Sequence, residues 1–184
     1  MELRKAEKKD MPYLKALYLE AFPAAERAPF RLLKKRAAQG RADFRVIYED
    51  GAPIGMAYVV TMNRLAYLFY YAIDASLRGR GYGTRALRAV IEEYRSFRLF
   101  LALEDPKEPA PNSEQRIKRH GFYKNCGLHD LPYHIKEATV LYAIMGTGDP
   151  VEPEEYKAMM NRYAGFPMRF LVDMRIIKDS EEKI

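Results

Sequence analysis

The chain has 184 residues and is 48% hydrophobic, which predicts one domain over residues 1–184 with a single substantial core. Its 31 basic and 25 acidic residues are interspersed, so the net charge of +6 suits a small acidic ligand better than nucleic acid. A single cysteine, Cys126, excludes an internal disulfide, which is consistent with a reducing compartment such as the cytoplasm. No apolar run approaches the length of a membrane span, so we expect a cytoplasmic protein without a membrane anchor.

The first part of the chain predicts a strand followed by two helices. Residues 2–6 are short enough for an opening strand, and Asp10 is a good N-cap for the helix that follows. Residues 22–30 carry two prolines and interrupt this helix, and a second helix from about Phe30 to Ala38 ends at a glycine.

Three strands in succession come next. Apolar and polar residues alternate over 44–49, a second extended run covers 54–62, and residues 65–73 form an uncharged, aromatic third run. Asp50-Gly51 and Asn63-Arg64 make the turns between them, so the three strands should be antiparallel. A parallel doubly wound fold would have helices between its strands, and this order excludes it.

The third strand leads into a loop that predicts an anion site. The loop reads Arg78-Gly79-Arg80-Gly81-Tyr82-Gly83, and an amphipathic helix follows from Thr84. Glycines leave backbone amides uncovered, the helix N-terminus adds partial positive charge, and two arginines add full charges, so a phosphate group is the expected ligand. The glycine spacing fits neither the dinucleotide fingerprint nor a P-loop.

This loop resembles motif A of the GCN5-related N-acetyltransferase (GNAT) superfamily, Arg/Gln-x-x-Gly-x-Gly/Ala. The resemblance implies an α+β fold with a mixed, mostly antiparallel central sheet flanked by helices, in which the loop amides hold the pyrophosphate of acetyl coenzyme A (acetyl-CoA). The alternative interpretation is a glycine-rich connecting loop that carries basic residues but binds no cofactor. The cofactor-binding residues that the resemblance implies are Ala72, Ile73, Arg78, Gly79, Arg80, Gly81, Tyr82, Gly83 and Thr84.

A second motif lies beyond the next strand. Residues 99–103 form a short buried strand that ends at Glu104, and Asn112 or Ser113 can cap the following helix. The segment 122–128, Phe-Tyr-Lys-Asn-Cys-Gly-Leu, then resembles motif B of the same superfamily, with leucine in place of the final phenylalanine. The resemblance also makes Asn112 a candidate cofactor contact, although it lies four residues before the position where the family often has an asparagine. Two further strands, near 131–135 and 138–145, would close the sheet.

Acetyl transfer to an amine needs a proton acceptor for the amine and a proton donor for the departing thiolate. The resemblance implies that an amide near Ile73 polarises the thioester and that Tyr123 lies beside the sulfur as proton donor and cofactor contact; a packed aromatic ring is the alternative. Glu104 is the first candidate for the base, Glu26 the second and a water molecule the third. The pair Glu26-Arg27 could instead form an ion pair that fixes the bend between the first two helices.

Other reactive side chains are left out of the expected mechanism. Cys126 reads as a small buried residue, because no histidine is placed beside it by a recognisable motif. The three histidines, His120, His129 and His134, lack the spacing of metal ligands, so we expect no metal.

The superfamily core should end near Met145, and residues 146–184 form an extension. A helix is predicted from Pro153 to Gly165, and alternation from Met168 to Ile176 predicts a strand. This strand could cover a sheet edge or pair with a second copy of the chain in a homodimer.

We therefore expect an acetyl-CoA-dependent N-acetyltransferase that transfers the acetyl group directly, in a ternary complex, to a primary amine of a small molecule. The alternative is a non-catalytic module on the same fold, either a sensor for coenzyme A (CoA) or another phosphate ligand, or a basic module that docks RNA. No substrate motif in the sequence identifies the acceptor amine.

Overall fold

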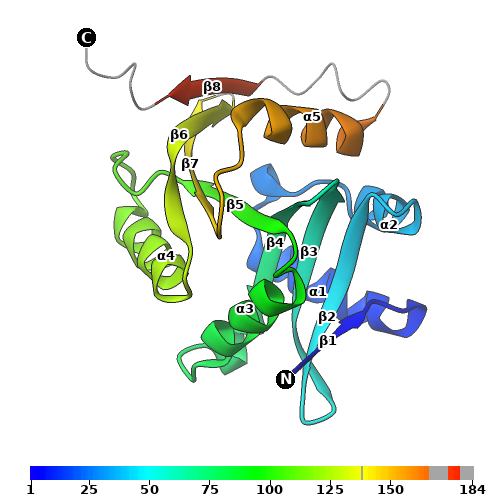
Figure 1. The fold of residues 1–184 in the computed structure, drawn as a ribbon. Helices are drawn as coiled ribbons and strands as arrows, with labels where there is room; N and C mark the ends of the chain where they lie inside the picture. Colours follow the sequence, from blue (N-terminus) through cyan, green and yellow to red (C-terminus); the bar gives the residue numbers. More distant parts are fainter. Residues whose placement is uncertain (138, 166–173, 179–184) are drawn as a thin grey trace. The chain divides into compact units, whose positions relative to one another are not determined.

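The computed structural model describes residues 1–137, 139–165 and 174–178. The chain divides into two compact units, Met1–Arg95 (unit 1) and Ser96–Ile184 (unit 2). The single domain expected over the whole chain stays a prediction. Unit 1 contains β1 (Glu2–Lys5), η1 (Lys8–Asp10), α1 (Met11–Ala21), η2 (Ala24–Glu26), α2 (Phe30–Ala38), β2 (Ala42–Glu49), β3 (Ala52–Met62), β4 (Leu65–Ile73), η3 (Ala75–Leu77) and α3 (Tyr82–Glu93). The α-helices and strands carry their labels in Figure 1.

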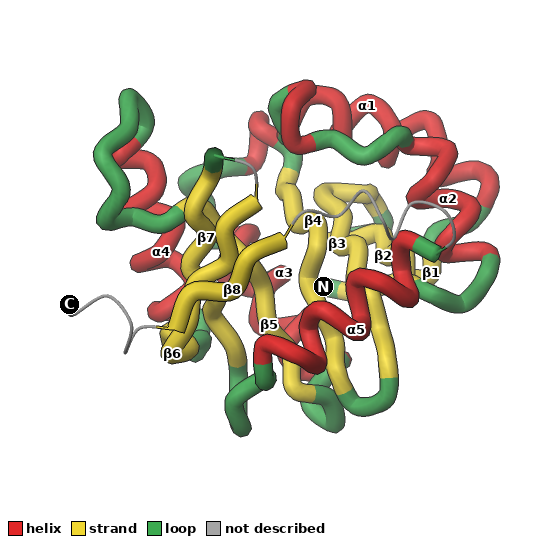
Figure 2. The backbone as a smooth tube through the Cα atoms, turned by 90° about the horizontal axis from the view of Figure 1, so that it is seen from above, coloured by secondary structure: helices red, strands yellow, loops and turns green. Residues whose placement is uncertain are grey.

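The strands of unit 1 form an antiparallel sheet in chain order, β1-β2-β3-β4. Positive φ angles at Asp50 (50°), Gly51 (80°) and Asn63 (50°) mark the two tight turns, residue types that tolerate the left-handed region. The predicted hairpins are therefore confirmed. In the tube drawn in Figure 2 the neighbouring strands appear as one layer with helices beside it.

The two faces of this sheet carry different helices. Adjacent residues of a strand point to opposite faces, and Tyr70 packs edge-on against Tyr18 of α1, whereas Tyr71 reaches Gly83 of α3. The α1 face is aromatic, with Tyr58 fully buried at its centre. A smaller aliphatic cluster fills the α3 face and consists of Ile47, Ile54, Ile73 and Ala86.

The N-terminal helices follow the prediction closely, with one correction. α1 begins directly after Asp10, and α2 has the predicted bounds. Asp10 does not cap α1 with its side chain. Its carboxylate instead accepts hydrogen bonds from the Glu7 amide and the Tyr48 hydroxyl, both at 2.8 Å. The bond to Glu7 belongs to the capping box of η1, the short helix that precedes α1.

In its described residues, unit 2 contains four strands and two helices. Its strands lie in the order β5-β7-β6-β8, and every neighbouring pair is antiparallel. α5 is held to β5 by an edge-on contact between Tyr156 and Phe100 and by a bidentate Arg98–Glu155 ion pair (2.6 and 2.9 Å). The elements are β5 (Arg98–Glu104), α4 (Ser113–Asn125), β6 (His129–Glu137), β7 (Val140–Gly146), α5 (Pro153–Ala164) and β8 (Met174–Lys178).

The C-terminal extension covers an edge of the unit 2 sheet. β8 pairs with β6 in antiparallel register, from Tyr133 opposite Lys178 to Glu137 opposite Met174 (Figure 1). Residues 168–173 of the predicted strand lie outside the described residues. α5 confirms the predicted helix. Each described helix is too short or too polar to cross a bilayer.

Candidate active site

The glycine-rich loop of unit 1 connects β4 to α3. Asp74 follows the strand and accepts hydrogen bonds from Ser76 N (3.0 Å) and Ser76 Oγ (2.7 Å), which fixes η3 ahead of the loop. Gly79 and Gly81 have φ of 75° and 77°. A Cβ at either position would meet no atom within 4 Å, so backbone conformation rather than space requires glycine there.

The loop ends in the N-terminus of α3. Gly81 is the N-cap, so the helix begins at Tyr82, two residues before the predicted start at Thr84. The first helical hydrogen bond runs from Arg85 N to Gly81 O (3.1 Å), which leaves the amides of Tyr82, Gly83 and Thr84 without an intrahelical acceptor. The structure thus places the predicted residues 78–84 around one helix N-terminus, an arrangement that favours anions.

Neighbouring side chains brace this helix N-terminus. The Arg85 guanidinium lies over the Tyr82 ring, 4.8 Å from its centroid, and forms a 2.6 Å ion pair with Glu49 of β2. Arg78 and Arg80 are exposed. The Arg85–Glu49 ion pair therefore holds α3 to the sheet. Arg78 and Arg80 lie on the surface, in the loop that precedes the uncapped amides.

Two features of the β3–β4 pair were not predicted from the sequence. The register with β3 shifts so that Tyr58 opposes Tyr70 and Val59 opposes Leu68, which makes Phe69 the extra residue of a β-bulge. Bulges redirect backbone groups and occur next to active sites, but a uniformly apolar strand gives no sign of one. The second feature is Gly55 of β3, where a Cβ would lie 2.6 Å from the carbonyl oxygen of Ala72.

In unit 2, Glu104 ends β5 and is surrounded by side chains of α4. Its carboxylate contacts Arg116 (2.6 Å), Asn112 (3.2 Å) and Arg119 (3.8 Å), and the Glu104 side chain is only 15% exposed. These charge-assisted contacts tie the end of β5 to α4. The spacing i, i+4, i+7 of the three partners is a signal in the sequence that predicts one helix face.

Tyr123 lies near the C-terminus of α4. The helix continues through Phe122 and Tyr123 to Asn125, and Gly127 has φ of 99°. Gly127 N bonds to Lys124 O (3.0 Å) and Leu128 N to Tyr123 O (3.2 Å), the two hydrogen bonds of a Schellman motif. The spacing Tyr-x-x-x-Gly is therefore that of a helix C-terminus.

Burial raises the pKa of Tyr123 to about 12, and the positive charge of Arg119 only partly opposes this. The ring contacts Phe122, with 5.2 Å between centroids. Tyr123 consequently keeps its proton across the whole range of neutral pH, as a hydrogen-bond donor must.

The other residues singled out in the sequence lie at the first bend and at the two ends of α4. Glu26 is exposed in η2, and its backbone carbonyl accepts from the Tyr70 hydroxyl (2.9 Å). Arg27 donates to Leu19 O (3.1 Å), so a carbonyl of α1 holds this arginine at the bend. Cys126 is buried, at 8% exposure, in agreement with the predicted packing role. Asn112 occupies the N-cap of α4 but donates to Glu104 instead of capping the helix.

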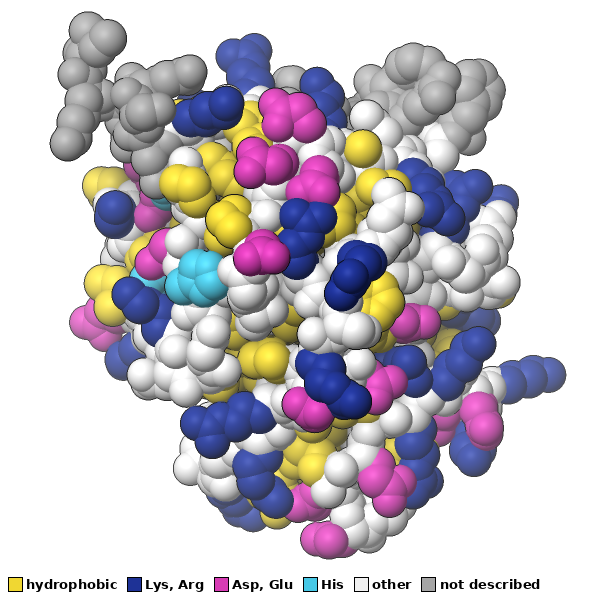
Figure 3. Space-filling model, viewed as in Figure 1, with side chains coloured by type: hydrophobic (Ala, Val, Ile, Leu, Met, Phe, Trp, Pro, Cys, Tyr) yellow, Lys and Arg dark blue, Asp and Glu magenta, His cyan; other side chains and the backbone are white. Residues whose placement is uncertain are grey.

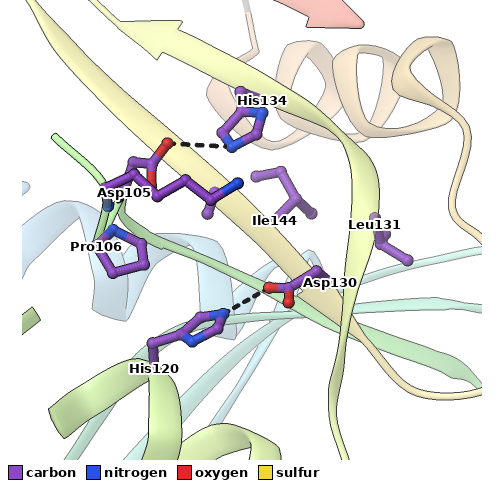
Figure 4. A pocket seen from close by; sticks show the side chains of 9 residues that line it. Asp105, Pro106, His120, Asp130, Leu131, His134 and Ile144 are labelled. Carbon is purple, nitrogen blue, oxygen red and sulfur yellow. Dashed lines mark hydrogen bonds and ion pairs between the residues drawn. The ribbon is translucent and has the colours of Figure 1, made fainter. Parts of the chain in front are cut away.

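A pocket of about 120 Å³ lies within unit 2, between α4, the β5–α4 loop, β6 and β7. Two histidine–aspartate pairs line it (Figure 4): His120 Nε2 is 2.6 Å from Asp130 Oδ1, and His134 Nε2 is 3.1 Å from Asp105 Oδ2. Between these pairs the β6–β7 register skips at 130–134, where Pro132 supplies no amide hydrogen. The two pairs tie α4 and the preceding loop to β6.

On the face shown in Figure 3, Lys and Arg side chains are scattered among Asp and Glu. Among residues 1–137, 139–165 and 174–178, no three His, Cys, Asp or Glu side chains are grouped so that they could hold a metal ion.

Solved structures identify the class of fold. A chain from Bacteroides thetaiotaomicron assigned to the GNAT family superposes with a TM-score of 0.74 at 21% identity, covering 92% of this chain and 99% of that one. A GNAT-like decarboxylase in complex with isobutyryl-CoA gives 0.63 at 16% identity (80% and 99% covered). An aminoglycoside 6′-N-acetyltransferase complexed with coenzyme A gives 0.59 at 14% identity (83% and 99% covered).

The fold is accordingly the GNAT fold, a mixed and mostly antiparallel sheet flanked by helices. The model of the acetyltransferase (GNAT) family matches residues 11–128, more than half of the chain, and the protein belongs to this family of acyltransferases. No curated protein is similar enough in sequence to count as a match.

Proposed function

We propose that the protein transfers the acetyl group of acetyl-CoA to a primary amine of a small molecule. The observation that carries the proposal is the loop of unit 1, where Gly79 and Gly81 take positive φ angles and α3 begins, next to Arg78 and Arg80, with three amides that lack an intrahelical acceptor. A pyrophosphate is the kind of anion that a glycine-rich loop at a helix N-terminus binds. Membership of the GNAT family supplies the reaction class.

The reaction follows from the groups present. The neutral amine attacks the thioester carbonyl, the C–N bond forms, the C–S bond breaks, and the sulfur leaves as a thiolate. We propose that Tyr123 donates a hydrogen bond to this thiolate. Its pKa of about 12 lies well above that of an ordinary thiol, so the phenol stabilises the developing charge by hydrogen bonding before it gives up a proton.

The amine proton needs a different acceptor. Because Arg116 and Arg119 hold the Glu104 carboxylate, we assign Glu104 to the anchoring of α4. Glu26, whose side chain is exposed, or a water molecule then accepts the proton. Glu26→Gln separates these two: a large loss of kcat that is absent with acceptors of low amine pKa identifies the carboxylate as the base.

A thiol-release assay with acetyl-CoA tests the function. Polyamines, aminoglycosides, amino acids and peptides form the acceptor panel, and the fold shared with an aminoglycoside acetyltransferase is the reason to include aminoglycosides. Calorimetric titration with CoA runs in parallel. Binding without thiol release on any acceptor would favour the non-catalytic sensor, and a steeply salt-dependent interaction with RNA would favour the docking module. The absence of CoA binding would overturn the proposal.

A further inference from the structure

Tyr71 of β4 makes a contact that neither the family motif nor the expected mechanism includes. Its hydroxyl donates to the carbonyl oxygen of Gly83 at 2.6 Å, a short distance for a neutral hydrogen bond. The ring is half-buried and packs against the aliphatic cluster under α3. The side chain is therefore fixed by packing, and its hydroxyl is directed at the first turn of α3.

The accepting carbonyl belongs to a particular peptide group. Gly83 C=O and Thr84 N–H are parts of one peptide unit, and the Thr84 amide is among the three that lack an intrahelical acceptor at the start of α3. A donor on the carbonyl oxygen polarises the peptide and makes its N–H a stronger donor. It also fixes the plane of the peptide, and so the direction in which that N–H points.

We propose that Tyr71 is a positioning residue for the pyrophosphate of the cofactor. It acts through the Gly83–Thr84 peptide: the hydroxyl holds and polarises this unit from the sheet side, and the Thr84 N–H binds a phosphate oxygen on the other side. The inference rests on the proposed binding of acetyl-CoA at this loop. It adds a residue outside the glycine motif to the binding of the anion, without direct contact.

Tyr71→Phe removes the hydroxyl and keeps the packed ring. The matched control is Tyr58→Phe in the same unit, because the Tyr58 hydroxyl also donates to a helix carbonyl, Leu33 O at 3.0 Å, but in α2. Dissociation constants are measured for CoA and 3′-dephospho-CoA, which contain the pyrophosphate, and for pantetheine, which lacks it. Melting temperatures of the three proteins are recorded without ligand.

Tyr71→Phe should weaken both pyrophosphate ligands by about 3- to 10-fold, the range expected for one hydrogen bond, and leave pantetheine unchanged. Tyr58→Phe should leave all three affinities unchanged. In the CoA complex the Thr84 amide proton should move upfield in Tyr71→Phe, which reports a weaker hydrogen bond directly.

Equal weakening of CoA and pantetheine would show a structural role only and would overturn the inference. An unchanged CoA affinity with an unshifted Thr84 amide would do the same while leaving the proposed function intact. If the wild-type protein binds neither CoA nor 3′-dephospho-CoA, the proposed function fails first, and the inference falls with it.

Discussion

Replacing Gly81 by aspartate and by asparagine isolates the charge of the proposed cofactor. The two side chains have nearly the same shape, and both tolerate the left-handed region better than other residues, so they share the backbone cost of φ 77° at this position. The site has room, because a Cβ at Gly81 meets no atom within 4 Å. Only one negative charge distinguishes the two variants.

That charge should act in opposite directions on the free and the bound protein. Gly81 is the N-cap of α3, where a carboxylate interacts favourably with the helix dipole by about 0.3–1 kcal/mol. Beside a bound pyrophosphate at about 6 Å, an added charge costs about 3 kcal/mol at an effective dielectric constant near 20. Because Gly81 is exposed, solvent reduces this value, and the aspartate variant should bind CoA about 10- to 100-fold more weakly than the asparagine variant.

Calorimetric titration of both variants with CoA at low and high salt, and their melting temperatures without ligand, test this reasoning. The aspartate variant should be at least as stable as the asparagine variant, and the affinity gap should narrow as salt rises. Equal affinities for CoA would show that no phosphate lies near Gly81. A gap that also appears with pantetheine would indicate a distorted loop instead of a charge effect.

Three further substitutions test other parts of the structure. Tyr123→Phe should lower kcat about 10- to 100-fold with little change in CoA affinity. Because burial raises the pKa of Tyr123 to about 12, the wild-type pH–rate profile should show no limb from this phenol below about pH 11. Unaltered kcat with a lower melting temperature would remove Tyr123 from the mechanism. Gly55→Ala should destabilise the protein by about 1–3 kcal/mol in chemical denaturation and weaken CoA binding, because its Cβ would press on Ala72 O; a variant as stable as the wild type contradicts this. Gly121→Ala should stabilise the protein by about 0.5–1 kcal/mol, because the position lies inside α4 with no atom within 4 Å of the new Cβ, and a fall in stability would contradict the assigned helix.

The order of elements in unit 1 was predictable because each signal in the sequence is local. Asp50-Gly51 and Asn63 specify tight turns by their tolerance of positive φ, and the runs between them are long enough to be read as strands. The loop at 78–83 was predictable for the same reason, since alternating glycines disfavour helix and strand and allow the positive φ angles that Gly79 and Gly81 adopt.

Features that depend on partners distant in sequence were not predictable. Glu104 was selected as a base from its place at a strand end, but whether a carboxylate is available depends on Arg116 and Arg119, which α4 brings back to it. The bulge at Phe69 arises from the pairing with β3 and leaves no trace in a uniformly apolar run. The Tyr71–Gly83 contact likewise needs the position of α3 on the sheet before it can be seen.

The two motifs share one physical basis, which explains why they were visible in the sequence at all. In the first, Gly81 takes a positive φ at the N-cap of α3, and in the second, Gly127 takes a positive φ just beyond the C-cap of α4. A glycine required by backbone geometry cannot be exchanged for another residue without strain, so its spacing to a functional neighbour is fixed by helix geometry. A general base has no such constraint, because a carboxylate on any of several loops, or a water molecule, can accept a proton. Sequence therefore specifies the groups proposed to hold the cofactor more strongly than the group proposed to activate the amine, and substitutions at the glycines should impair CoA binding with every acceptor amine.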